Sequence, residues 1–178
     1  MKVNPQGSVP VAKDLRPTVD ASNPWVVDSG TICDWLESSF ASPPSVGTVE
    51  EASSAPGGDL FPAFAGFIKA AVGSPEEGEK REKLDEAVLS LAKAIEASGK
   101  PFLCGDAPKQ ADFALAPKLH HLSIAAPAHK GWSFPDGSKA VTDYLGRMRA
   151  RPSWKAHEYS DECVVAGWKK NVGVDAKK

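Results

Sequence analysis

The stretch from Val3 to Gly30 constrains the fold most, because the sequence favours β-strands only here. Each of two short valine-containing runs follows a turn signal that contains proline, as strand boundaries often do. The predicted strands are Ser8–Lys13 and Trp25–Val27. Everything after them has the patterning of helices, so we predict an α+β fold that is mostly helical.

Pro10 and the pair Asp28-Ser29 are the unusual residues of this stretch. Pro10 cannot donate a ladder hydrogen bond, and the bond before a proline is the one place where a cis peptide is cheap. Val9 would therefore have its own N–H and C=O free for another partner. Asp28 and Ser29 favour a helix over Ser29–Ser39, whose amino end would suit a carboxylate. Alternatively, Pro10 only ends an edge strand and the pair only caps a helix.

In this order the features resemble the glutathione-binding half of the glutathione transferase superfamily, where a V-P pair with a cis proline follows an N-P-x-G turn. Five separated blocks, covering nearly the whole chain, are similar to plant and algal dehydroascorbate reductases: KVNPQGSVPV, WVVDSGTI, ADFALAPKLHHL, KGWSFP and VVAGWKKNV. The resemblance implies that the backbone of Val9, beside Pro10, pairs with the cysteinyl part of glutathione. It also implies that Asp28 and Ser29 hold the γ-glutamyl end.

The resemblance also implies a domain organisation and a reaction. We expect a partial, truncated thioredoxin-like glutathione-binding domain over residues 1–42 and an all-α C-terminal domain over residues 60–178. Between them, residues 43–59 are rich in Pro, Ser, Gly and Ala, which predicts a linker. Glutathione would be the co-substrate and dehydroascorbate the substrate, in a chain that we expect to be monomeric.

One departure from the family concerns the nucleophile. Family members have a strand, a helix and a second strand before the N-P-x-G turn, and that helix opens on a C-P-[FS]-x motif with the catalytic cysteine. This sequence starts at Met1-Lys2-Val3, so we expect no counterpart of that cysteine. The reaction needs a low-pKa thiolate. The alternative is therefore a non-catalytic binding or interaction module of the glutathione transferase type.

Three cysteines are present, and we expect each to be a small buried apolar residue: Cys33, Cys104 and Cys163. Their odd number and wide spacing argue against a disulfide framework and fit a reducing compartment. None has a C-x-x-C partner or a neighbouring metal ligand, so we expect no metal site.

The charge is nearly balanced, with 21 basic and 23 acidic residues and a formal net charge of -2. Without a basic patch that contains aromatic residues, a nucleic-acid partner is not expected. Apolar runs are far shorter than a membrane span, and Met1 opens no secretory signal, so no membrane partner is expected. We predict a cytoplasmic protein, and the same features allow the chloroplast.

Helix signals are clear after residue 59. Apolar spacing predicts a helix over Leu60–Val72, and Ser74-Pro75 followed by Glu77 is a capping-box pattern for a long helix that ends near Gly99. Further helices are expected over Gln110–Ile124, around Val141–Met148 with Pro152 as its stop, and at Ser160–Trp168.

The helix over Gln110–Ile124 carries the remaining polar candidates. Asp112 matches the acidic member of an S/T-x-x-D cap, but Lys109 stands where the hydroxyl should be, so this helix start is weaker or capped from elsewhere. His120 and His121 point apart on a helix and cannot act as a pair, and we expect both to be structural or surface residues. His121 is the better candidate to line a cleft, with Lys118 as a possible positive charge for an anionic substrate.

Overall fold

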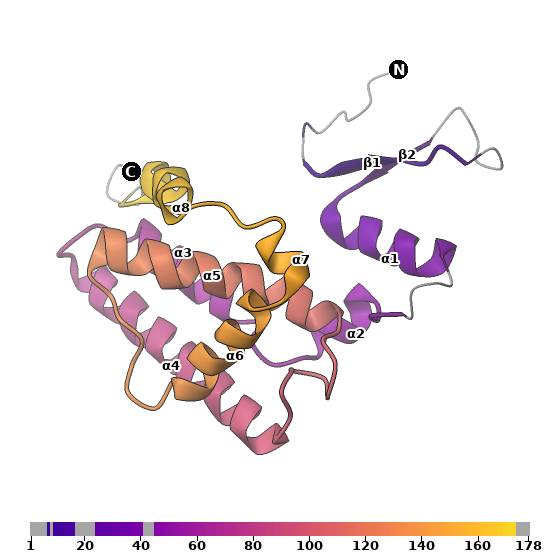
Figure 1. The fold of residues 1–178 in the computed structure, drawn as a ribbon. Coiled ribbons are helices and arrows are strands. Elements are labelled where there is room, and N and C mark those ends of the chain that lie inside the picture. The colour runs from indigo at the N-terminus through magenta and orange to yellow at the C-terminus, as the bar shows by residue number, and fades with distance from the viewer. Residues whose placement is uncertain (1–6, 8, 17–23, 41–44, 174–178) are drawn as a thin grey trace.

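A computed structural model describes residues 7, 9–16, 24–40 and 45–173. Two strands and a helix come first, and helices make up the rest of the described chain (Figure 1). The predicted α+β, mostly helical fold is confirmed. The elements are β1 (Val11–Lys13), β2 (Trp25–Val27), α1 (Ser29–Ser39), α2 (Val49–Ser53), α3 (Leu60–Lys69), α4 (Pro75–Ser98), α5 (Gln110–Lys130), α6 (Lys139–Arg149), α7 (Pro152–Lys155) and α8 (Asp161–Trp168), followed by the 3-10 turn Lys169–Asn171.

The two strands form an antiparallel sheet in which Val11 lies opposite Val27. One backbone hydrogen bond extends the pairing at each end, from the N–H of Asp14 to Pro24 O at 2.7 Å and from the N–H of Asp28 to Pro10 O at 3.3 Å. The first strand is shorter than expected and begins at Val11. Ser8 and the turn residues 4–6 and 23 lie outside the described residues.

The helical part is built around α5, which crosses the body and packs against α2, α3, α6 and α8 (Figure 1). Apolar side chains of α3, α4, α5 and α6 meet in one core, because their apolar residues recur every three or four positions. The largest fully buried members are Trp132, Tyr144, Phe64, Phe67, Leu60, Ile68, Leu84, Leu91, Leu119, Leu122, Met148 and Val88.

The start of α4 follows its sequence signal. Ser74 Oγ accepts the N–H of Glu77 at 3.2 Å, and Pro75 is the first helical residue. Glu77 does not complete the capping box on Ser74. Its carboxylate accepts the N–H of Gly73 at 2.6 Å and bonds Lys130 Nζ at 2.6 Å, which ties α4 to the end of α5.

The start of α5 is capped from elsewhere, as one of the two alternatives predicted. Lys109 has no acceptor in its side chain. The N–H of Gln110 instead bonds Val46 O at 2.6 Å, and the carboxylate of Asp112 accepts the N–H of Lys109 at 2.8 Å. The amino end of α5 is therefore stabilised by the segment that precedes α2.

Three helix ends differ from the sequence prediction. Helix α5 continues to Lys130, beyond the expected Ile124, and ends at Gly131 with φ +58°, a conformation that glycine tolerates. Helix α3 stops at Lys69 because Ala70 turns to ψ 147°. Helix α6 ends at Arg149, and Pro152 does not stop it but opens α7 as its first residue.

A short helix, α2, lies within the segment predicted as a linker. Thr48 caps it by accepting the N–H of Glu51, and Glu51 accepts the N–H of Thr48 in return. The N–H of Val49 donates to Asp34 of α1 at 2.9 Å. Helix α2 thus lies between α1 and the helical body. Residues 43 and 44 of the expected linker lie outside the described residues.

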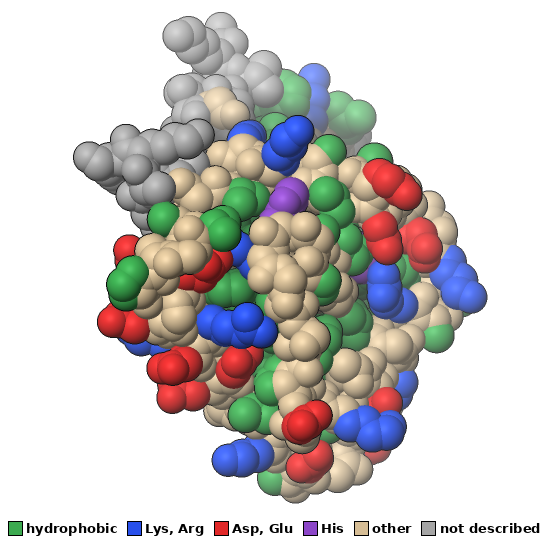
Figure 2. Space-filling view, turned by 90° about the vertical axis from the view of Figure 1, so that its left-hand side faces the viewer, with side chains coloured by type: hydrophobic (Ala, Val, Ile, Leu, Met, Phe, Trp, Pro, Cys, Tyr) green, Lys and Arg blue, Asp and Glu red, His purple; other side chains and the backbone are tan. Residues whose placement is uncertain are grey.

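The surface has mixed charge on the face that carries α8. Figure 2 shows acidic and basic side chains interspersed there among apolar ones. Among the helices that the structure describes, none is long and apolar enough to cross a lipid bilayer.

Candidate functional site

The residues predicted to hold glutathione come together at the start of the chain. The Val9-Pro10 peptide bond is cis. Pro10 O accepts the N–H of Asp28 at 3.3 Å, so the end of β2 lies directly beside the V-P pair. Val9 is 86% exposed, and Asp28 and Ser29 are exposed too. The geometry therefore places an accessible backbone segment next to an accessible helix start.

Asp28 has an unusual backbone conformation. Its φ is 77° and its ψ is 137°, and it is the one non-glycine residue with positive φ in the described part of the chain. Such a conformation costs an L-residue about 1–3 kcal/mol and is concentrated at functional positions. Here it lets the carboxylate fold back onto α1, where Oδ1 accepts the N–H of Gly30 at 2.9 Å and of Thr31 at 3.3 Å.

The same corner contains Gly30, the second residue of α1. A Cβ built on Gly30 would lie 3.2 Å from Asp28 Oδ1 and 3.3 Å from Val49 Cγ2. The absence of a side chain therefore allows the Asp28 cap and the neighbouring helix α2 to approach α1 together.

A second candidate site lies between α3, α5 and α8. It is a hollow of about 480 Å³ whose walls include Phe61, Lys118, His121, Tyr159 and Trp168. Trp168 Nε1–H donates to His121 Nδ1 at 2.9 Å, and His121 Nε2 lies 2.5 Å from the hydroxyl of Tyr159. Because Nδ1 accepts, the neutral ring carries its proton on Nε2 and donates it to Tyr159.

This arrangement leaves a donor free to face the hollow. Burial lowers the pKa of His121, which favours the neutral ring. With its oxygen accepting from His121, the hydroxyl of Tyr159 has its own proton available, and 48% of Tyr159 is exposed. Lys118 Nζ lies 5.7 Å from the ring centroid of Phe61 and adds a positive charge at the same wall. The hollow can therefore bind a small molecule rich in oxygen acceptors.

His121 was anticipated from the sequence as a residue that lines a cleft. Trp168 was expected as the end of the last helix, and it packs on Phe64 with ring centroids 4.7 Å apart. Tyr159 was missed. It lies 38 residues from His121 in the sequence, and no local pattern joins the two.

The expectation that all three cysteines are buried is wrong for two of them. Cys104 and Cys163 are exposed, and Cys33 is half-buried within α1. Cys104 lies in the surface connection between α4 and α5, which the apolar residues before it do not reveal. Partial desolvation by the neighbouring chain raises the pKa of its thiol, and the nearby negative charge of Asp112 adds to this effect.

Within the described residues, no three or more His, Cys, Asp and Glu side chains form a group that could hold a metal ion. His120 differs from His121. The residue is 3% exposed and borders a second cavity beside α5.

Residues 52–147 match the family described as the glutathione S-transferase C-terminal domain. The chain is also 32% identical over 172 residues to the glutathione S-transferase DHAR2 of Arabidopsis thaliana, covering 97% of this chain and 75% of that relative. The chain belongs to the glutathione transferase superfamily. It is a dehydroascorbate-reductase-like member, since a solved dehydroascorbate reductase from Chlamydomonas reinhardtii superimposes with a TM-score of 0.68.

Other relatives in the superfamily agree with this assignment. The chloroplastic glutathione S-transferase DHAR3 of Arabidopsis thaliana is 35% identical over 174 residues, and the match covers 97% of this chain and 62% of the relative. The Chlamydomonas structure is 28% identical, with 84% of this chain and 68% of that chain covered. A trimeric glutathione transferase from Leishmania, 20% identical, shares the fold with a TM-score of 0.77 over 96% of this chain and 39% of that chain.

These comparisons confirm the predicted fold class, a partial thioredoxin-like part followed by the helical C-terminal domain of glutathione transferases. The chain spans 62% of the length of DHAR3 and 75% of that of DHAR2. The domain limits at residues 42 and 60, and the roles of Val9, Pro10, Asp28 and Ser29, stay predictions.

Proposed function

We propose that this chain binds glutathione at Val9, Pro10, Asp28 and Ser29 and serves the glutathione-dependent reduction of dehydroascorbate. The observation that carries the proposal is the hydrogen bond from the N–H of Asp28 to Pro10 O, which brings the Val9 backbone beside the start of α1. An extended peptide could pair with Val9 while its charged end reaches that helix start.

The helix start offers both charges that a γ-glutamyl group needs. Its ammonium would face the Asp28 carboxylate, of which only Oδ1 is used for capping. Its carboxylate would face the Ser29 hydroxyl and the positive end of the α1 dipole. Charge-assisted hydrogen bonds of this kind are about twice as strong as neutral ones.

Dehydroascorbate would occupy the hollow beside His121. Its carbonyl oxygens are acceptors, and the hydroxyl of Tyr159 and the ammonium of Lys118 are donors at that wall. The overall reaction moves two electrons and two protons, so two glutathione thiols become one disulfide while dehydroascorbate becomes ascorbic acid. The residues of this chain supply binding and orientation, and the thiol step needs a thiolate.

The test of glutathione binding compares substitutions that keep the helix cap with matched controls. Asn caps a helix as well as Asp does, so Asp28→Asn should leave α1 intact while removing the charge. Glutathione affinity, measured by titration calorimetry on the 178-residue chain, should fall about 10-fold or more. Glu50→Gln removes one negative charge from an exposed position of α2 and should leave the affinity unchanged. Equal affinity in both variants would refute the assignment of Asp28.

Ser29 is tested in the same way. Ser29→Ala should weaken glutathione binding about 5-fold, since a neutral hydrogen bond is worth about 1 kcal/mol. Ser38→Ala at the other end of α1, where the hydroxyl donates to Trp35 O at 3.1 Å, is the control. A weakening that is equal in the two variants would indicate a general effect on the helix and not a ligand contact.

A non-catalytic binding module is the second candidate, favoured by the lack of any C-P dipeptide in these 178 residues. Ascorbate formation by the purified chain, followed by ultraviolet absorbance, separates the two functions. Glutathione binding without turnover supports the module. Turnover that Cys33→Ser abolishes supports catalysis by this chain, because the thiolate would then come from Cys33, one turn inside α1.

The names of the relatives give two candidate compartments. They include chloroplastic and cytosolic proteins, and we infer that this chain acts in the cytoplasm, with the chloroplast as the alternative.

We also propose that it is a monomer, which sedimentation velocity would test directly. The β1–β2 sheet, however, has unpaired edges in the described part of the chain, and such edges favour association.

A further inference from the structure

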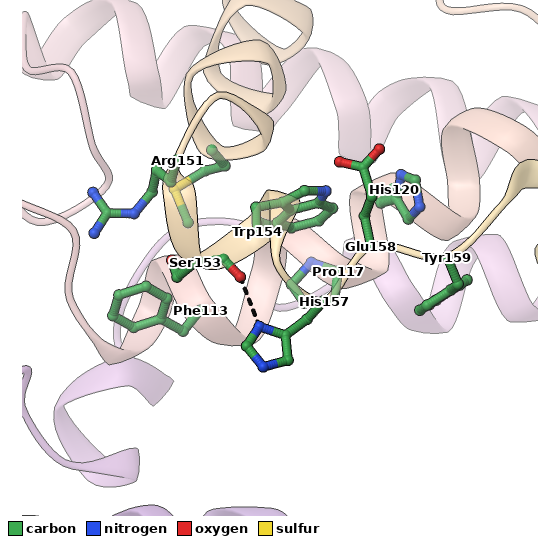
Figure 3. Close-up of a pocket in the computed structure, with 11 residues that line it drawn as sticks. Phe113, Pro117, His120, Arg151, Ser153, Trp154, His157, Glu158 and Tyr159 are labelled. Carbon is green, nitrogen blue, oxygen red and sulfur yellow. Dashed lines mark hydrogen bonds between the residues drawn. The ribbon is translucent and has the colours of Figure 1, made fainter.

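A second cavity lies beside α5, next to the His121 hollow. Its volume is about 270 Å³, and α5, the end of α6, α7 and the connection before α8 surround it (Figure 3). The walls are mostly apolar and aromatic, with Phe113, Met148 and Trp154 among them. Trp154 packs edge-on against the ring of His120, with centroids 5.2 Å apart and planes at 88°.

Unpaired polar groups lie buried in the walls of this cavity. Across the described residues, the buried side-chain nitrogen and oxygen atoms without a hydrogen-bond partner are His120 Nδ1, His120 Nε2 and Arg151 Nε. Both residues border the cavity. Buried polar groups in folded proteins are nearly always paired, so orphaned groups around one space indicate a missing partner. In Figure 3, Arg151 and His120 lie on opposite sides of Trp154.

The neighbouring polar side chains do not satisfy these atoms. His157 uses Nδ1 to bond Ser153 O at 2.9 Å (Figure 3). Glu158 is exposed. The guanidinium of Arg151 lies 5.9 Å from the ring centroid of Phe113, so its cationic group and an aromatic wall meet at the same end of the cavity.

The chemistry of a complementary ligand follows from these groups. Arg151 Nε–H can only donate, and a carboxylate is its best acceptor. A neutral imidazole has one donor and one acceptor, which a hydroxyl matches because it can do both. The aromatic walls suit a flat ring. An apolar cavity of about 150 Å³ is enough to hold benzene, so the space here has room for a ring with two polar substituents.

We propose that this cavity is a binding site for a small aromatic hydroxy-acid, with the carboxylate on Arg151 Nε–H, the ring against Trp154 and the hydroxyl on His120. The site is separate from the glutathione residues and from the His121 hollow, although Pro117 and Tyr159 border both hollows. Its occupancy does not depend on whether the chain reduces dehydroascorbate.

Three probes test the proposal by titration calorimetry on the 178-residue chain. 4-Hydroxycinnamate carries both polar groups, cinnamate lacks the hydroxyl, and 4-ethylphenol lacks the carboxylate. We expect 4-hydroxycinnamate to bind with one molecule per chain, about 5-fold tighter than cinnamate and about 10-fold or more tighter than 4-ethylphenol. Absence of saturable binding, or equal binding of all three probes, would overturn the proposal.

Two variants assign the contacts. His120→Phe keeps a ring of similar size and should abolish the difference between 4-hydroxycinnamate and cinnamate. Arg151→Met keeps the length of the stem and should abolish the difference between 4-hydroxycinnamate and 4-ethylphenol. Lys118→Met, on α5 and in the wall of the neighbouring hollow but not of this cavity, is the control and should change neither difference. If it weakens binding as much as His120→Phe does, the probe occupies the neighbouring hollow and the proposal fails.

The unsubstituted chain gives an independent reading in case His120→Phe does not fold. In nitrogen-15 NMR spectra, the ring nitrogens of His120 should shift on addition of 4-hydroxycinnamate and much less with cinnamate. Unchanged ring nitrogens at saturating 4-hydroxycinnamate would refute the contact with His120.

Discussion

Asp112 should be one of the side chains on which the helical domain depends most. Its carboxylate is fully buried at the start of α5 and accepts three hydrogen bonds, from Leu103 N at 2.9 Å, Lys109 N at 2.8 Å and Tyr144 Oη at 3.0 Å. These donors belong to the connection before α5, to the cap residue of α5 and to α6. One side chain therefore joins three segments of the core.

The structure sets the expected cost of Asp112→Ala. Hydrogen bonds to a charged group contribute about 1.5–3 kcal/mol each, and a donor left buried and unpaired costs about 1–3 kcal/mol. Lys109 is exposed and Leu103 is half-buried, so water can reach their N–H groups and the lower values apply. Tyr144 is fully buried, so its hydroxyl takes the upper value. We expect a loss of about 5 kcal/mol in the free energy of unfolding.

Urea unfolding followed by far-ultraviolet circular dichroism measures this loss, which corresponds to a decrease of about 10–20 °C in Tm. Tyr144→Phe alone should cost about 1–2 kcal/mol, and the double variant should show a coupling of similar size because the two groups share a bond. Asp136→Ala, at an exposed position, should change stability by about 0.5 kcal/mol or less. A loss under about 1.5 kcal/mol for Asp112→Ala, or strict additivity with Tyr144→Phe, would refute the reasoning.

Three further predictions concern charges. Lys130→Met should reduce the free energy of unfolding in urea by about 1–3 kcal/mol, because the fully buried ammonium bonds Glu77 at 2.6 Å, and Glu77, whose side chain is 19% exposed, still reaches water after the substitution. The bond to Lys130 lowers the pKa of Glu77, so it stabilises the fold above the ordinary carboxyl pKa, and the stabilisation disappears as pH falls through the lowered pKa. In acid unfolding curves, the loss of stability over this pH range should be smaller for Lys130→Met. The bidentate contact with Arg16 lowers the pKa of Asp14 to about 2, and NMR titration of Arg16→Gln should find it near the usual value. Alkylation of Cys104, followed by mass spectrometry, should be slower at neutral pH than that of a free thiol, because the pKa of Cys104 is raised.

The sequence predicted best where the signals are local. Both limits of α1 match, and Asp28 caps its start as the sequence predicted. The start of α4 and its end at Gly99 match for the same reason, because a capping serine and a left-handed glycine act within a few residues.

Prediction failed where tertiary contacts decide the structure. Helix α3 was expected to reach Val72, but Ala70 turns away and its carbonyl accepts Lys130 Nζ at 2.7 Å, a contact across 60 residues. The extension of α5 to Lys130 has a similar cause, since Ala125 and Ala126 are fully buried in the core and Pro127 does not interrupt the helix. Neither the Lys130 bond nor the burial of these alanines produces a periodic pattern in the sequence.

The candidate sites also differ in how far the sequence revealed them. Motif order and the family resemblance suggested that the V-P pair and the Asp28 helix start belong together, and the structure places them in hydrogen-bond contact. The network around His121 was invisible, because its partners lie 38 and 47 residues away in the sequence. The unpaired nitrogens of His120 and Arg151 could be found only from the packed side chains.

Helix α5 has a consequence for the evolution of the protein. Phe113 and His120 border one hollow, Lys118 and His121 border the other, and Pro117 belongs to both. A substitution at Pro117 therefore alters both recognition surfaces at once. Substitutions that adapt one hollow to a new compound should therefore accumulate in α7, which borders only the first hollow, or in α8, which borders only the second. The residues of α5 near Pro117 should change more slowly.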